Sequence, residues 1–107
     1  MDIQLKRGLL DICVLTAIKN EDSYGYKIIQ SLSGIIDISE STLYPILRRL
    51  EANKCLESYS VENNGRLRKF YSITSLGEEK IKDYLKDFKE LMMIYNYIAK
   101  EVKENVE

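Results

Sequence analysis

The fold is most clearly specified by "SESTLYPILRRL", Ser39 to Leu50. At about 100° per residue, a helix over this stretch gathers its apolar side chains in one narrow sector, namely Leu43, Ile46, Leu47 and Leu50. The opposite side is small, polar or basic and consists of Ser41, Pro45, Arg48 and Ala52, flanked by Tyr44 and Arg49. We therefore predict a helix from about Ser39 or Ser41 to about Asn53, with one face in the core and the other exposed.

Pro45 lies inside this helix although it has no N–H group to donate. If Ser41 is the N-cap, Pro45 is the fourth helical residue, close to the turn in which the N–H groups lack intrahelical partners anyway. If Ser39 is the N-cap, Pro45 is the sixth helical residue and a kink is expected. In both cases Pro45 faces away from the core.

Two further helices are predicted before this one. The segment from Gln4 to Asn20 is apolar around most of its circumference, which is typical of a buried central helix. Ser23 has the position of an N-cap for a second helix, and Gly34 suits the residue just past its C-terminus. Only a few residues then lead to Ser39, a spacing typical of a helix-turn-helix.

A β-hairpin is predicted next, because "CLESYSVE" (55–62) and "RLRKFYSIT" (66–74) are rich in β-branched and aromatic residues. Between them lies "NNG", and Asn64-Gly65 readily takes the positive φ angles of a tight hairpin turn. The second strand begins with cations, so the tip of the hairpin is expected to be basic, with Arg66, Arg68 and Lys69 at or near it.

A long helix is predicted to close the chain, with Ser75 and Glu78 at the spacing of a capping box. Its apolar residues recur in steps of three and four, a coiled-coil-like stripe that continues to Val106. A helix of about 30 residues reaches roughly 45 Å, longer than one small domain is wide, so part of the stripe needs a second chain to cover it. We expect a homodimer interface at Tyr84, Leu85, Phe88, Leu91, Met92, Tyr95, Ile98, Ala99 and Val102.

Composition narrows the class of protein. At 107 residues the chain is the size of one domain, and it has neither an apolar run of membrane-spanning length nor the pattern of a signal peptide, so we expect a cytoplasmic protein without a membrane partner. It contains no histidine and two cysteines, Cys13 and Cys55, too few for a zinc site. We therefore expect no metal, no cofactor and no catalytic residue, and interpret the chain as not an enzyme.

Charge is distributed unevenly along the chain. The net charge is −1, but residues 41–70 contain six basic and three acidic side chains, whereas both flanking segments are acidic. A basic middle between acidic flanks is typical of a local nucleic-acid-binding surface. Together with a helix-turn-helix followed by a hairpin, it predicts a winged-helix DNA-binding domain, in which a helix enters the major groove and the hairpin tip follows nearby phosphates.

The motifs "RGLLDICVL", "DSYGYKI", "STLYPILRRLE" and "YSITSLG" occur in the order and spacing of the PadR family of bacterial transcriptional regulators, which the chain resembles over nearly its whole length. The resemblance implies a homodimeric repressor of the short subfamily. Its fold would be mainly α with a small β-hairpin: a winged helix-turn-helix domain over 1–74 and a C-terminal dimerisation helix over 75–107. We expect it to bind a pseudo-palindromic operator in double-stranded DNA.

The resemblance also implies which residues meet DNA. Ser41, Thr42, Tyr44, Pro45 and Arg48 match the recognition-helix motif, with Arg49 beside it, and the expected wing contacts are Asn64, Arg66, Arg68 and Lys69. In the second helix Tyr24 and Lys27 are weaker candidates for phosphate contacts. Tyr44 could equally pack at the edge of its helix, and Gly25 of the "YGY" motif indicates close packing.

Two departures from the family pattern leave questions open. Where the family usually has a glycine after the recognition helix, this chain has "ANKCL", so Asn53 or Lys54 must take the turn, and asparagine tolerates positive φ better. Tryptophan is absent, so stacking of an aromatic drug on a tryptophan of the last helix is not carried over. A small hydrophobic effector could still bind near Met92, Met93, Tyr95 and Tyr97, although plain dimer core is the favoured interpretation.

Another class of function and a role for the cysteines must also be considered. A winged-helix scaffold can serve as a protein-interaction module that never touches DNA, because a fold does not determine a function. An acidic recognition face would favour that module, whereas the outer face here is basic. The cysteines are expected to be packing residues, since neither has an evident partner for redox chemistry.

Overall fold

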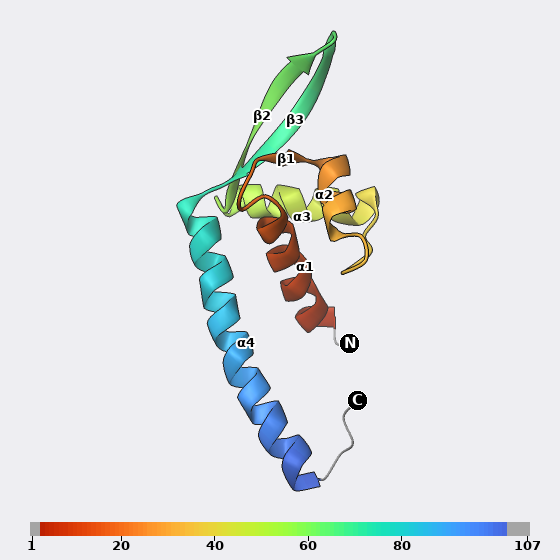
Figure 1. Cartoon of the computed structure of the whole chain (residues 1–107). Coiled ribbons are helices and arrows are strands. Elements are labelled where there is room, and N and C mark those ends of the chain that lie inside the picture. Colours follow the sequence, from red (N-terminus) through yellow and green to blue (C-terminus); the bar gives the residue numbers. More distant parts are fainter. Residues whose placement is uncertain (1–2, 103–107) are drawn as a thin grey trace.

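The computed structural model describes residues 3–102, apart from the side chains of residues 3 and 4. Its elements are α1 (Ile3–Ala17), β1 (Ser23–Tyr24), α2 (Gly25–Leu32), α3 (Glu40–Ala52), β2 (Leu56–Asn63), β3 (Arg66–Ile73) and α4 (Ser75–Val102). Three helices, a hairpin that projects from them and a long last helix form the predicted winged-helix architecture (Figure 1). The fold class expected from the sequence is thus confirmed.

The core lies where α1, α2 and α3 meet beneath the base of the hairpin. The expected inner face of α3 is confirmed, since Leu43, Ile46, Leu47 and Leu50 are all buried. They pack with Val14, Leu15 and Ile18 of α1 and Ile28 of α2 in one cluster. Burying a leucine or isoleucine contributes about 1.5–3 kcal/mol, so this cluster fixes which side of α3 is left outside.

Ser39 is the N-cap of α3, with an extended backbone at φ −93° and ψ 168°. Pro45 is therefore the sixth helical residue, the second of the two predicted alternatives. The helix nevertheless runs unbroken to Ala52. The hydrogen bond that Pro45 cannot donate would have gone to the carbonyl of Ser41, which is an exposed residue that water can reach.

The predicted N-cap of α2 is wrong. Ser23 lies in the two-residue strand β1, which pairs with Tyr71 and Phe70 of β3, and Tyr24 occupies the N-cap position without a side-chain capping bond. The sheet therefore has the strand order β1-β3-β2, one strand more than the hairpin expected from the sequence. A two-residue strand is too short to show a period in the sequence.

Both turn predictions can be compared with the backbone. Asn64 and Gly65 have φ angles of +54° and +79°, which confirms the tight hairpin turn. After α3, however, it is Lys54 (φ +62°) and not Asn53 (φ −87°) that takes the left-handed conformation. The N–H of Lys54 bonds to the carbonyl of Glu51 and that of Cys55 to the carbonyl of Leu50, a Schellman motif whose geometry assigns positive φ to Lys54.

The start of α4 differs from the predicted capping box by one residue. Thr74, not Ser75, is the cap, since its Oγ1 accepts the N–H of Gly77 at 3.1 Å and donates to the carbonyl of Lys54 at 2.7 Å. Gly77 lies so close to the turn after α3 that a Cβ there would overlap the carbonyl oxygen of Cys55. The beginning of α4 is thereby tied to the end of α3.

The rest of α4 extends away from the compact part of the chain (Figure 1), and the molecule measures 61 × 26 × 22 Å. Its first turns pack on α1, where Tyr84 covers Gly8. Beyond them the apolar stripe is exposed: Leu85, Phe88, Leu91, Met92, Tyr95, Ile98 and Val102 all lie open, while the small Ala99 is buried. Val106, the expected end of the stripe, lies outside the described residues.

Candidate nucleic-acid interface

The outer face of α3 is exposed as expected. Ser41, Thr42, Pro45 and Arg48 all lie open on the side opposite the core. The hydroxyls of the first two are linked to the N-cap, with Ser39 Oγ 2.9 Å from Ser41 Oγ and 3.3 Å from Thr42 Oγ1. Arg48 is exposed two turns from the N-terminus of the helix, so its guanidinium is free to reach a groove or a phosphate.

Tyr44 occupies the edge of α3 that faces α2 and the hairpin. A Cβ built on Gly25 would lie 2.5 Å from Tyr44 Oη and 3.0 Å from its Cζ, so the ring rests directly on the first residue of α2. The close packing predicted for Gly25 is confirmed. Tyr44 is still 38% exposed, which leaves its hydroxyl able both to pack and to meet a ligand.

A groove of about 620 Å³ separates this edge of α3 from the hairpin. It is lined by six of the residues that the sequence analysis proposed for DNA contact, namely Tyr24, Tyr44, Asn64, Arg66, Arg68 and Lys69. Glu40 is the single acidic residue among the described residues that line the groove. The folded chain therefore brings residues from three separate segments together in one mainly basic groove.

The three hairpin cations do not share one face of the sheet. Side chains alternate along a strand, so Arg66 and Arg68 lie on the same side of β3 as Phe70, and Lys69 lies on the side of Tyr71. The guanidinium carbon of Arg68 is 4.2 Å from the centre of the Tyr24 ring, and Lys69 Nζ is 5.8 Å from that of Tyr71. Contacts of this kind contribute about 0.5–1 kcal/mol at exposed sites and orient the charges.

A stack of aromatic rings, which the sequence analysis missed, anchors the hairpin. The Phe70 ring lies edge-on to Tyr24 at 5.4 Å and stacks with Tyr59 at 5.8 Å. Tyr59 Oη donates to Asp22 at 2.6 Å, and this hydrogen bond raises the pKa of Tyr59. Since Tyr24 is the N-cap residue of α2, the stack sets the position of the hairpin relative to the helices. The alternation of Tyr59 with polar residues was visible in the sequence, but its partners on other strands were not.

Two predicted contacts are paired elsewhere. Lys27 Nζ lies 2.6 Å from Glu21 Oε1, and that hydrogen bond raises the pKa of the lysine and lowers that of the glutamate. Arg49 turns toward α1, where it forms an ion pair with the buried Asp11. The structure therefore does not bring Lys27 or Arg49 together with the groove residues.

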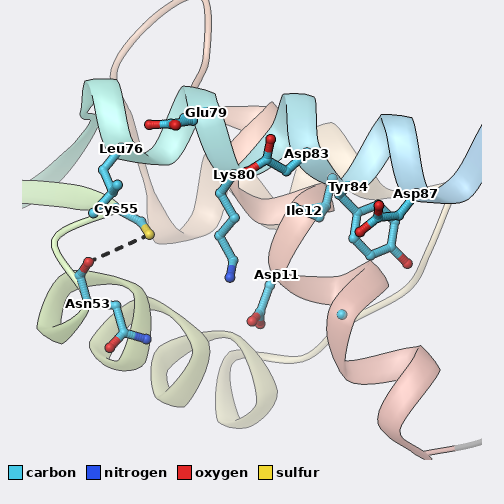
Figure 2. A pocket seen from close by; sticks show the side chains of 11 residues that line it. Asp11, Ile12, Asn53, Cys55, Leu76, Glu79, Lys80, Asp83, Tyr84 and Asp87 are labelled. Carbon is cyan, nitrogen blue, oxygen red and sulfur yellow. Dashed lines mark hydrogen bonds between the residues drawn. The ribbon is translucent and has the colours of Figure 1, made fainter.

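A second cavity, of about 540 Å³, lies between α1, the end of α3 and the start of α4 (Figure 2). Its charged lining is mainly acidic, with Asp11, Glu79, Asp83 and Asp87 around Lys80. This negative charge would repel a polyanion such as DNA. Tyr84 also lines it, and burial raises the pKa of that tyrosine. Within residues 3–102 no cluster of histidine, cysteine and carboxylate side chains has the arrangement of a metal site.

Cys13 and Cys55 are not joined by a disulfide. Burial raises the pKa of the Cys13 thiol, which disfavours its reactive thiolate form. Cys55 is buried just before β2, where its Sγ lies 3.8 Å from the carbonyl oxygen of Asn53. Both are free thiols in packing positions.

None of the helices in the described part of the chain combines the length and the apolar character that a membrane span needs. The described chain is a winged helix with an exposed basic groove between α3 and the hairpin and an exposed apolar stripe on α4.

The sequence and the fold were compared with those of known proteins. Residues 14–83 match the family described as "Transcriptional regulator PadR-like family". An uncharacterized protein of Lysinibacillus sphaericus is 38% identical over an alignment of 93 residues, and the match covers 82% of this chain and 85% of the relative. The solved structure of a PadR-like transcription factor from Bacteroides fragilis is 35% identical, with a TM-score of 0.80 over 90% of this chain and 95% of the other.

A more distant neighbour is the structure of Bacillus subtilis PadR in complex with operator DNA. It is 20% identical, with a TM-score of 0.66 over 72% of this chain and 45% of that protein, and so shows a shared fold. The family match and the two nearer relatives show more than a fold: the chain belongs to the PadR-like family of transcriptional regulators.

Proposed function

We propose that this chain is a cytoplasmic transcriptional repressor that binds a pseudo-palindromic operator as a homodimer. The observation that carries the proposal is the exposed outer face of α3 beside a basic groove formed with the hairpin. A helix of this kind fits the major groove, and a basic hairpin follows the adjacent backbone. The complex of the distant relative from Bacillus subtilis with operator DNA supports the same use of the fold.

Individual roles follow from position and chemistry. Arg48 reads a guanine edge or holds a phosphate, since its fork of donors suits both. The hydroxyls of Ser41, Thr42 and Tyr44 hold phosphates, and Pro45 keeps the surface between them flat. Tyr24 contributes its hydroxyl at the start of α2, while Asn64, Arg66, Arg68 and Lys69 follow the backbone from the hairpin.

Paired side chains are assigned different roles in this proposal. Arg49 holds α3 against α1 through Asp11 and thereby sets the orientation of the recognition helix. Lys27 is held by Glu21 and contributes at most a weak phosphate contact.

The exposed apolar face of α4 is the proposed dimer interface. Seven large apolar side chains of the predicted stripe lie open along one face of this helix, a surface that a second copy would cover. The dimer would place two α3 helices on one face of DNA, with half-sites about one helical turn apart. Met92 and Tyr95, both exposed on this stripe, would then meet their counterparts, either as plain core or around a small hydrophobic effector. Met93 and Tyr97 are also exposed, but the helical period places them on the opposite side of α4.

Binding of a duplex enriched from a random DNA pool tests the proposal. Replacing Arg48 with alanine should weaken binding to that duplex by roughly 5- to 150-fold for each half-site, which corresponds to the about 1–3 kcal/mol expected for one base-edge contact, while binding to unrelated duplex falls less. Lys86→Ala on α4 removes the same charge far from α3 and serves as the control. Unchanged binding by Arg48→Ala would remove that residue from the proposal.

The alternative is a winged-helix module that binds a protein and no DNA. Failure of the wild-type chain to enrich any duplex from the pool, with an intact fold by circular dichroism, would favour it.

A further inference from the structure

A second groove, of about 290 Å³, flanks α3 on the side opposite the hairpin. It is lined by Thr42, Pro45, Ile46 and Arg49 from α3 and by Lys6, Arg7 and Leu10 from α1. Apolar side chains of the two helices form its floor. Thr42, Pro45 and Arg49 belong to the interface predicted from the sequence, whereas Lys6 and Arg7 do not, because they are far from α3 along the chain.

The charge of this groove is one-sided. Lysine and arginine side chains contribute three cations to its lining, and no carboxylate lines it among the residues that the structure describes. Arg49 is neutralised by Asp11, which leaves Lys6 and Arg7 as the uncompensated pair. Both are exposed, and no ion pair involves either of them within residues 3–102.

The groove is continuous with the proposed DNA-reading face. Thr42 and Pro45 belong both to the outer face of α3 and to this groove, just as Tyr44 belongs to the outer face and to the groove beside the hairpin. Figure 1 shows α3 lying between the hairpin on one side and α1 on the other. Cations are therefore present on both flanks of the recognition helix.

The dimensions of DNA explain how cations on both flanks of α3 could contact it. The major groove is about 12 Å wide, and an α-helix with its side chains is about 10–12 Å across. A helix seated in the groove consequently has one phosphate backbone close to each of its flanks. Side chains as long as lysine and arginine can reach these walls from the elements beside the helix.

We propose that Lys6 and Arg7 bind the phosphate backbone on the α1 side of the major groove, while the hairpin binds the backbone on the other side. Each protomer then holds both walls of the groove that α3 enters. This inference rests on the proposed function and extends its DNA-contacting surface to a fourth segment of the chain. An acidic segment of a second copy would also suit the cations, but Thr42 and Pro45 link the groove to the face that meets DNA.

The test compares the salt dependence of binding to the enriched duplex, measured by fluorescence anisotropy between low and moderate salt. Removing one phosphate contact lowers the slope of log K against log salt by about 0.9, so Lys6→Gln/Arg7→Gln should lower it by about 1.8 per protomer. Arg7→Lys, which keeps the charge, should leave the slope close to that of the wild type. Lys82→Gln/Lys86→Gln makes the same change in net charge on α4 and controls for the long-range field.

The outcomes separate this inference from the proposed function. Wild-type binding that Arg48→Ala weakens, together with an unaltered slope for Lys6→Gln/Arg7→Gln, overturns the phosphate contact and leaves the proposed function standing. Dissociation of the dimer by that double variant in sedimentation velocity shows that a second copy occupies the groove, and also overturns it. If the double variant is poorly folded, Lys6→Gln alone decides, since its slope should fall by about 0.9 per protomer. Absence of any duplex binding by the wild type refutes the proposed function itself.

Discussion

Replacing Gly77 with alanine should destabilise the protein, although alanine is the better helix former. An added Cβ would overlap the carbonyl oxygen of Cys55 and lie 2.7 Å from Cγ1 of Ile73. The nearest atom belongs to the backbone and cannot rotate away, so the start of α4 must move off the turn that follows α3. That movement stretches the hydrogen bonds from the Thr74 N–H to Cys55 at 3.1 Å and from the Thr74 hydroxyl to Lys54 at 2.7 Å.

The size of the effect follows from these competing contributions. Two weakened hydrogen bonds cost about 1–3 kcal/mol and overpacking costs about 1–3 kcal/mol, whereas the gain in helix propensity is about 1 kcal/mol at most. We expect the free energy of unfolding to fall by about 2–4 kcal/mol, which corresponds to a Tm lowered by roughly 10–20 °C. The measurement is urea denaturation followed by circular dichroism at one fixed protein concentration, because a dimer makes stability depend on concentration.

Gly8→Ala is the matched control. Gly8 also lies in a helix, but there an added Cβ would meet Cε2 of Tyr84 at 3.3 Å, and a side chain can shift by the few tenths of an ångström required. The propensity gain then offsets the crowding, and the stability should change by less than about 1 kcal/mol. Equal stability of the two variants would contradict the role assigned to the close backbone approach at Gly77.

Three further variants test other contacts of the fold and of the proposed interfaces. Arg49→Ala should lower the free energy of unfolding by about 1–3 kcal/mol, because it leaves the buried Asp11 without its partner, and a smaller decrease in urea denaturation would show that water replaces the guanidinium. Gly25→Ala should change stability little, but its Cβ should displace the Tyr44 ring and so weaken DNA binding. Tyr44→Phe removes the clashing hydroxyl and should partly restore binding in the double variant, whereas losses of binding that simply add would contradict this contact. Leu91→Lys places a charge in the exposed stripe of α4 and should yield monomers in sedimentation velocity, whereas an unchanged sedimentation coefficient would exclude this face as the dimer interface.

The features predictable from the sequence are those with a local period or a local turn. The buried face of α3 follows from four apolar residues at helical spacing, and the hairpin turn follows from Asn64-Gly65. Helix caps were less predictable. Ser23 is a good N-cap by residue type, but its pairing with Tyr71 places it in a strand instead. Likewise, Thr74 caps α4 in place of Ser75 because its hydroxyl also reaches the carbonyl of Lys54.

In the candidate site, too, some features could be predicted from the local sequence and others could not. Positions on the outer face of α3 could be predicted by counting residues along one helix. The contact of Arg68 with the Tyr24 ring, the pairing of Arg49 with Asp11 and the position of Arg7 in one groove with Pro45 depend on contacts between distant segments. Such contacts leave no periodic signal in a single sequence, since residue type alone does not tell which charge will be neutralised.

Selection of duplexes from a random DNA pool by the wild-type protein is the decisive experiment for the proposed function. We predict enrichment of a pseudo-palindrome whose half-sites are centred about 10–10.5 base pairs apart, or a multiple of that distance, with Arg48→Ala losing preference at one position of each half-site. An enriched sequence that Arg48→Ala binds as well as the wild type does would remove Arg48 from the DNA-reading face. A pool that stays random after repeated rounds would contradict the proposed function.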